Sequence, residues 1–278
     1  MSVFPPERLN RFLARRGVAS RRGADQLIAD GRVTVNGEMS QLGTVVDPSL
    51  DRVSVDGHRI PARAVSVTIV LNKPVGVVTT RSDPYQRRTV MDLIEPVPGL
   101  VPVGRLDADS RGLLVLTTDG DLAHAVSHPR HGVTKRYVAT LDRPIAQEQL
   151  EQITTGVDLE DGPARALTAQ RSGSDSMVEV VMAEGRKREV RRLFAAVGLE
   201  VRDLVRVAVG PLELGALPEG EARALRPAEL SSLRAAAGMR APVRSESPRT
   251  PKRSSAPPSP ARNAAARTPS RTAARRPR

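Results

Sequence analysis

The stretch GRLDADSRGLLVLTTDG, residues 104–120, decides the fold of the larger part of this 278-residue chain. Its apolar run, residues 113–116, predicts a buried strand. A polar loop that contains Asp107 precedes the strand, and Gly112 is expected at the turn between them. Asp119 follows the strand and is a typical N-cap for the next helix. On residue types alone, Asp107 and Asp109 are turn formers, and any catalytic role needs further evidence.

Outward from this stretch, short runs of alternating apolar residues recur over residues 66–239. Helices are predicted near 119–127, 146–154 and 188–197, between these strand-like runs. The order is not a regular alternation of strand and helix, so a parallel doubly wound sheet is not expected. The prediction is an α+β domain over residues 66–239, built on a mixed and mostly antiparallel sheet.

Residues 6–62 are predicted to form a separate small domain of two helices and a small sheet. A short amphipathic helix ends near Gly17, and Ser20 is placed to cap a second helix. The dipeptides Asn36-Gly37 and Asp56-Gly57 each follow a pair of alternating valines. Such dipeptides favour two-residue turns between antiparallel strands. A Pro/Ala/Arg-rich linker is expected to join this domain to the next.

The formal net charge of +12 is concentrated at the C-terminus. Residues 240–278 contain eleven Lys/Arg, one Glu and eight prolines, whereas the rest of the chain carries 32 basic and 30 acidic residues. A segment with so few large apolar residues cannot bury enough surface to offset the entropy of ordering, so we expect a disordered basic tail. It is either a solubilising extension or a mobile anchor for polyanions.

Composition excludes several functional classes. The chain has no cysteine, which removes thiol nucleophiles and Cys-ligated zinc and fits a reducing compartment. Phosphate-loop and dinucleotide-turn signatures are missing, so an ATPase or a dehydrogenase is not expected. The longest apolar stretch, residues 64–71, is too short for a bilayer, and the N-terminus does not resemble a secretory signal. These features predict a cytoplasmic protein without a membrane association.

Three histidines, His124, His128 and His131, are the candidates for a metal site. The first two would share a helix face, but a proline follows and no carboxylate or thiol completes the ligand set. Capping or packing is therefore the preferred interpretation. No metal and no cofactor are expected.

The N-terminal 22 residues hold six arginines, and Glu7 is the one acid among them. Such crowding is unfavourable without an anionic partner, and guanidinium groups suit phosphate. The run RLNRFLARRGVASRRGADQLIADGRVTVNG, with the later LGTVVDPSLDRVSVDG, resembles the RNA-binding domain named after ribosomal protein S-four. The resemblance implies RNA as the partner. The arginines assigned to RNA binding are Arg8, Arg15, Arg16, Arg21 and Arg22.

The larger part of the chain resembles the rRNA pseudouridine synthases of the RsuA/RluB type. Four motifs match in order: LNKPVGVVTT, the GRLD stretch quoted above, KRYVA and EGRKREVRRLFAAVG. The resemblance covers residues 66–238 and implies isomerisation of uridine to pseudouridine in rRNA, without a cofactor. An S-four-like domain ahead of the synthase domain is this family's usual arrangement.

Carried over by motif, the resemblance makes Asp107 the essential aspartate, Tyr137 the active-site tyrosine and Arg191 the active-site basic residue. Arg105 falls on an arginine that the family uses near the flipped nucleotide. A carboxylate is required either to attack C1′ of the ribose or to remove a proton from the sugar, and both routes remain open. An adjacent guanidinium such as Arg191 would orient the carboxylate. Tyr85 is interpreted as an exposed loop residue.

The choice of RNA rests on fewer residues. Ser110 and Thr118 replace the Thr and Asn that are common in the family, which is a mild departure. Lys187, Arg188 and Glu189 resemble the subgroup that modifies large-subunit rRNA. The prediction is therefore a monomeric large-subunit (23S) rRNA pseudouridine synthase that acts during ribosome assembly. The alternatives are a small-subunit (16S) rRNA target and a non-catalytic RNA-binding assembly factor.

Overall fold

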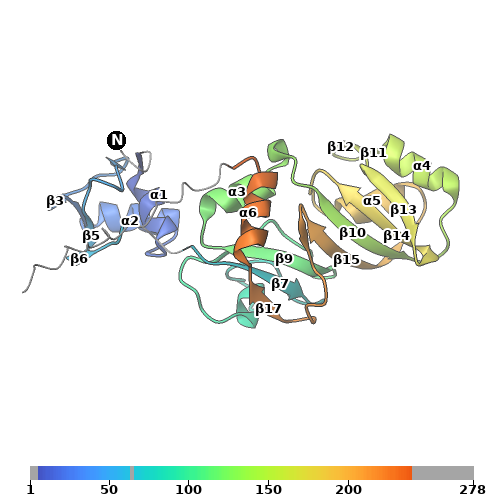
Figure 1. The fold of residues 1–278 in the computed structure, drawn as a ribbon, viewed down its shortest axis with the longest axis horizontal. Coiled ribbons are helices and arrows are strands. Elements are labelled where there is room, and N and C mark those ends of the chain that lie inside the picture. Colours follow the sequence, from blue (N-terminus) through green and yellow to red (C-terminus); the bar gives the residue numbers. More distant parts are fainter. Residues whose placement is uncertain (1–5, 63–65, 240–278) are drawn as a thin grey trace, which may run out of the picture. The chain divides into compact units, whose positions relative to one another are not determined.

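The computed structural model describes residues 6–62 and 66–239 (Figure 1). The predicted tail, residues 240–278, lies outside the described residues, as does part of the predicted linker. Within the described residues, no helix combines the length and the apolar character needed to cross a membrane.

The N-terminal part contains two helices and six short strands. They are β1 (Glu7–Arg8), α1 (Leu9–Arg15), α2 (Arg21–Ala29), β2 (Val33–Val35), β3 (Glu38–Met39), β4 (Val45–Val46), β5 (Val53–Val55) and β6 (His58–Arg59). Strands β3, β2, β5 and β6 form an antiparallel sheet in that order, and β1 pairs with β4. The helices bury Leu9, Phe12 and Ile28 against the valines of the strands.

Local sequence signals in this part are confirmed. The Ser20 hydroxyl accepts a hydrogen bond from the Gly23 amide at 3.0 Å and so caps α2. Asn36-Gly37 connects β2 to β3, and Asp56-Gly57 connects β5 to β6. All four turn residues have positive φ, as a two-residue turn of type I′ requires.

The larger part is built on one nine-stranded sheet. Its strands are β7 (Thr68–Lys73), β8 (Val101–Val103), β9 (Arg111–Thr117), β10 (Lys135–Leu141), β13 (Thr168–Ser172), β14 (Ser174–Met182), β15 (Val201–Val209), β16 (Leu212–Glu213) and β17 (Ala222–Ala224). The main path runs β13-β14-β10-β15-β9-β7-β17, while β8 pairs with β9 and β16 pairs with β15. All pairs are antiparallel except β9 with β15, which confirms the mixed, mostly antiparallel α+β prediction.

Helices and a small hairpin complete this part. They are η1 (Val90–Leu93), α3 (Gly120–Ser127), η2 (Pro129–His131), α4 (Gln147–Thr155), β11 (Val157–Leu159), β12 (Gly162–Ala164), α5 (Glu189–Ala196) and α6 (Pro227–Ala236). The three predicted helices correspond to α3, α4 and α5. Helix α6 was not predicted from the sequence, although Pro227 at its first turn and Glu229 two residues later are common start signals. Asp119 caps α3 as predicted, accepting from the Asp121 and Leu122 amides.

The sheet is covered on both faces. Alternate residues of β9 enter two different clusters: Leu114 and Leu116 pack with α5, whereas Leu113 and Val115 pack with α3 and α6. Figure 1 shows α3 and α6 beside β9 and β7. A strand buried on both faces has no polar face, which explains why residues 113–116 are continuously apolar instead of alternating.

The predicted position of Gly112 at a turn is wrong, because Gly112 lies within β9. Its φ is +104°, and a Cβ there would be 2.4 Å from the carbonyl oxygen of Arg206 on β15. The glycine therefore permits the close parallel approach of β9 to β15, just after the loop that carries Asp107.

Candidate active site

A cavity of about 220 Å³ lies between the loop that precedes β9 and the segment that precedes α5. Asp107 and Tyr137 both line it. Asp107 is half-buried on residues 104–110, which we call the GRLD loop, and Tyr137 is 8% exposed on β10. These two residues, which are 30 positions apart in the sequence, thus share one cavity as the motif resemblance implies.

The GRLD loop is fixed by the last residue of β7 and by the segment that follows it. The Lys73 ammonium donates to three carbonyl oxygens: those of Pro74 (2.9 Å), Asp107 (3.1 Å) and Ser110 (2.7 Å). The Gly76 amide donates to the Ala108 carbonyl at 2.8 Å. Thr79 makes the remaining contacts: its hydroxyl donates to the Leu106 carbonyl (2.7 Å) and accepts from the Leu106 amide (3.3 Å). The LNKPVGVVTT motif therefore holds the backbone on both sides of Asp107.

Lys73 is one of two residues at this site that were not predicted from the sequence. Its side chain is fully buried, and burial lowers its pKa to about 8, while the negative charges of Asp107 and Asp109 act in the opposite direction. A lysine that ends an apolar strand just before a proline is an unusual choice for a buried position. That pattern could have identified Lys73 as a functional candidate from the sequence.

Arg206 on β15 supports the same loop from the other side. It lies opposite Tyr137 in the β10–β15 register and is 4% exposed. Its Nε donates to the Leu113 carbonyl at 2.7 Å and its Nη1 to the Arg105 carbonyl at 3.3 Å. The Arg105 carbonyl belongs to the start of the GRLD loop and the Leu113 carbonyl to β9, so Arg206 links the start of this loop to β9. This arginine was not identified from the sequence either, because its acceptors lie 93 and 101 residues away along the chain.

Arg191 does not contact the Asp107 carboxylate but binds Asp109. Its Nη2 donates to the Asp109 carbonyl (2.8 Å), and its Nε lies 3.4 Å from a carboxylate oxygen of the same residue. Arg188 contacts both oxygens of that carboxylate, at 3.0 and 2.8 Å. Partial burial raises the pKa of Asp109, but the Arg188 hydrogen bond and the Arg191 charge outweigh it, and the net shift is downward. The hypothesised contact between Arg191 and Asp107 is thus replaced by a connection from α5 to the GRLD loop through Asp109.

The rim of the cavity is basic. Arg105 lines it together with Arg186, Lys187 and Arg188, and Arg105 and Lys187 are exposed. Arg186 also holds the segment before α5, because it contacts Glu189, which is 4% exposed, at 3.1 Å. A concave site with a carboxylate inside and cations outside suits a nucleotide whose phosphates remain at the rim.

Of the three histidines, His128 caps the 3-10 helix η2, and the rings of all three lie within 6.3 Å of one another. His128 accepts a hydrogen bond from the Arg130 amide at 3.2 Å, and Arg130 donates to His131 at 3.0 Å. Among the described residues, no group of three or more His, Cys, Asp or Glu side chains is arranged to hold a metal ion.

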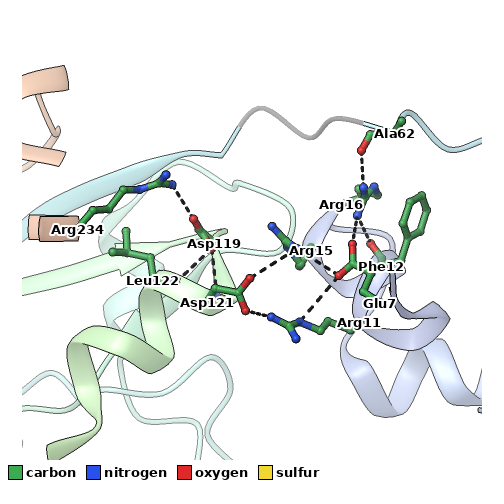
Figure 2. A network of polar contacts seen from close by, with 10 residues as sticks. All are labelled: Glu7, Arg11, Phe12, Arg15, Arg16, Ala62, Asp119, Asp121, Leu122 and Arg234. Atoms are coloured by element: carbon green, nitrogen blue, oxygen red, sulfur yellow. Dashed lines mark hydrogen bonds and ion pairs between the residues drawn. The ribbon is translucent and has the colours of Figure 1, made fainter. Parts of the chain in front are cut away.

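The arginines of the N-terminal part have different environments (Figure 2). Arg15 and Arg16 both contact the buried carboxylate of Glu7, at 3.2 and 3.4 Å. Arg16 also covers the Phe12 ring at 3.4 Å and donates to the carbonyls of Phe12, Pro61 and Ala62. Glu7 therefore offsets part of the repulsion between the crowded arginines, which was expected to need an RNA partner. Arg16 is a structural residue in this part, whereas Arg8, Arg21 and Arg22 are exposed.

This difference predicts separable effects. Replacing Arg16 with Ala removes several hydrogen bonds and the contact with Phe12, so the thermal unfolding midpoint is expected to fall by several degrees. Replacing Arg21 and Arg22 with Ala should leave the midpoint unchanged, weaken RNA binding and reduce its salt dependence. Thermal unfolding and RNA titrations at two salt concentrations measure both effects. Equal loss of stability in the two variants would contradict this assignment.

Comparison with known proteins places the site in a family. Residues 67–196 match the model of RNA pseudouridylate synthases, and residues 7–51 match that of the S4 domain. An uncharacterised RNA pseudouridine synthase of Aquifex aeolicus is 41% identical over 239 residues, which are 84% of this chain and 96% of the relative. The ribosomal large subunit pseudouridine synthase B of Bacillus subtilis is 40% identical over 83% of this chain and 97% of its own length.

A solved structure agrees with these sequence relatives. The crystal structure of a pseudouridylate synthase, 31% identical, superposes with a TM-score of 0.59 and covers 81% of this chain and 99% of that one. Both the fold and the extended sequence similarity thus lead to one assignment. The chain belongs to the RNA pseudouridine synthases, with an S4 domain ahead of the synthase domain.

Proposed function

We propose that this enzyme converts a specific uridine of large-subunit rRNA to pseudouridine, with Asp107 as the catalytic residue. The observation that carries the proposal is the position of Asp107 on a tethered loop, in a cavity that it shares with Tyr137 and that cations surround. The large subunit is supported by the name of the Bacillus subtilis relative and by the residues Lys187, Arg188 and Glu189.

The reaction is an isomerisation and balances within the nucleotide. The C1′–N1 bond breaks, the base turns, and a C1′–C5 bond forms; C5 loses its hydrogen and N1 gains one. Asp107 acts at the sugar, either by attack on C1′ or by removal of a proton. Tyr137 provides a ring on which the extruded base can stack. The basic rim, including Arg105, holds the flanking phosphates.

Arg191 acts on Asp107 indirectly, by holding Asp109 and with it the GRLD loop. Replacing Arg191 with Leu is expected to lower turnover by about 10²-fold, because a small displacement of a catalytic group is costly. RNA affinity and the slope of its salt dependence should stay nearly unchanged, since one charge among many phosphate contacts contributes little. Single-turnover rates and filter-binding titrations test this. A parallel collapse of affinity and of its salt slope would instead make Arg191 a phosphate contact.

The chain divides into three functional segments in this proposal. Residues 6–62 bind RNA through Arg8, Arg21 and Arg22, residues 66–239 catalyse, and residues 240–278 raise the local RNA concentration without setting register. The enzyme acts as a monomer, in the cytoplasm, on rRNA within assembling ribosomal subunits.

The test is a map of pseudouridine in rRNA. Ribosomal RNA from cells with and without this gene is labelled with a pseudouridine-specific carbodiimide, and the stops are mapped by primer extension. The expected result is the loss of one stop in large-subunit rRNA, restored by the wild-type gene and not by an Asp107→Asn gene. Loss of a stop in small-subunit rRNA would instead identify small-subunit rRNA as the substrate. An unchanged map together with normal RNA binding by the purified chain would favour a non-catalytic assembly factor.

A further inference from the structure

The segment between β7 and η1 contains an aromatic residue that the described residues leave largely exposed. We call residues 80–88 the Tyr85 loop. Tyr85 is 79% exposed, whereas the other aromatic residues in the described ranges, Phe12, Tyr137 and Phe194, are at most 8% exposed. A large exposed ring contributes little to folding, and such rings are common where a protein binds another molecule.

The Tyr85 loop is ordered by its own contacts. The Asp83 carboxylate accepts hydrogen bonds from the amides of Tyr85 (3.1 Å) and Arg87 (3.0 Å) and from the Arg87 guanidinium (2.7 and 3.1 Å). The base of the loop is closed by the bridge between Val78 and Thr89. Gln86 adopts a positive φ of 56° at the tip. The ring is therefore presented on a fixed backbone, which lowers the entropy cost of binding.

The same loop is joined to the catalytic residue. Thr79, at its base, binds both the amide and the carbonyl of Leu106, the residue before Asp107. A molecule held by Tyr85 is therefore held in a constant geometry relative to the reacting nucleotide. A contact at this place can contribute to the choice of uridine.

The charge of the loop indicates what it binds. The loop contains one acid, Asp83, and three arginines, Arg81, Arg87 and Arg88. All three arginines are exposed. Arg87 is paired with Asp83 and lies 5.4 Å from the centre of the Tyr85 ring, so Arg81 and Arg88 carry the excess charge. Exposed cations on the same short loop as an exposed ring match a nucleic-acid strand, in which phosphates alternate with bases. A protein partner would be expected to require a larger apolar patch than one ring.

We propose that the Tyr85 loop is an RNA-docking surface, on which Tyr85 stacks against an unpaired base next to the target uridine while Arg81 and Arg88 contact phosphates. This inference rests on the proposed function, since it needs an RNA substrate at Asp107. Extrusion of the target leaves its neighbours partly unstacked, and an aromatic side chain replaces the lost stacking.

Intrinsic fluorescence offers a direct test, because the chain has two tyrosines and no tryptophan. In a Tyr137→Phe variant, Tyr85 is the one remaining tyrosine. Titration with the rRNA stem-loop that contains the modified uridine is expected to quench its emission, after correction with free N-acetyltyrosinamide in the same RNA. A fully paired duplex of equal length should quench much less. Equal quenching by both RNAs, or none, would overturn the proposal.

Kinetics test whether the contact matters. Tyr85→Ala in the otherwise wild-type enzyme is expected to raise KM for the stem-loop about tenfold, the usual effect of losing one stacked base, with kcat within about twofold. Tyr85→Phe should retain the wild-type KM, because stacking needs the ring and not the hydroxyl. Leu167→Ala, which truncates another exposed apolar residue of the synthase domain, is the matched control and should change nothing.

The outcomes separate the two proposals. If wild-type enzyme forms no pseudouridine in any rRNA, the proposed function fails. If wild-type enzyme is active and Tyr85→Ala has the wild-type KM, the docking surface is wrong, whether or not fluorescence is quenched. If Tyr85→Ala modifies naked RNA normally but fails on assembled subunits, the loop binds a ribosomal protein, and the RNA proposal is likewise overturned.

Discussion

Replacing Asp107 with Asn is expected to reduce pseudouridine formation by at least about 10³-fold and to leave RNA affinity within about twofold. The amide has the shape of the carboxylate but can neither attack C1′ nor accept a proton from the sugar. Folding should be unaffected, because the tethers of this loop use the Asp107 carbonyl and the neighbouring backbone, which the substitution preserves.

The measurement follows from the chemistry. Because C5 exchanges its hydrogen for a bond to C1′, RNA that contains 5-tritiated uridine releases tritium as the reaction proceeds. Asp109→Asn is the matched control: it removes a carboxylate two residues away, and turnover should fall far less. A loss of turnover well below about 10³-fold in pure Asp107→Asn enzyme, or equal losses in the two variants, would contradict the catalytic assignment.

Replacing Lys73 with Met is expected to produce the largest loss of stability. Three carbonyl oxygens lose their donor, and each buried unsatisfied carbonyl costs roughly 1–3 kcal/mol of stability. Removal of the buried charge stabilises the folded chain and offsets part of this cost. We expect a net loss of about 3 kcal/mol in the free energy of unfolding. Turnover should also fall, because the GRLD loop is no longer held. Urea unfolding measures the stability, and the exposed Lys187→Met is the control.

The pH dependence of the Lys73 effect has a defined sign. The folded chain lowers the pKa of Lys73 from its usual 10.5 to about 8, so between these values the unfolded chain binds more protons. Stability contributed by this residue therefore rises from pH 8 towards pH 10.5. The difference in unfolding free energy between wild type and Lys73→Met should grow over this range. A constant or shrinking difference, or a loss below 1 kcal/mol at pH 7, would show that Lys73 is not buried as described.

The synthase site itself was only partly predictable. Asp107, Tyr137 and Arg105 came from motif resemblance and line one cavity. Residue chemistry alone made Asp107 a turn former, because an aspartate in a polar loop has the same local signal whether or not it is catalytic. Arg191 was expected beside Asp107, but it binds Asp109. A side chain of that length can reach either carboxylate, and only the packing of α5 decides between them.

What the sequence by itself determined is local. Ser20 and Asp119 cap helices, and Asn36-Gly37 and Asp56-Gly57 form turns, because each interaction is completed within about four residues. These signals identify elements and their ends without any knowledge of what the elements pack against.

The tertiary structure decided the rest. Lys73 binds carbonyls 34 and 37 residues away, and Arg191 binds one 82 residues away. Gly112 is required because its φ is +104° and because β15 approaches β9 at that point. Such contacts depend on which strands pair and in what register, and this is set by the burial of whole strands on both faces of the sheet. The sequence of a single segment does not specify its partner strand or its register, since the apolar run 113–116 can pair with any other buried strand.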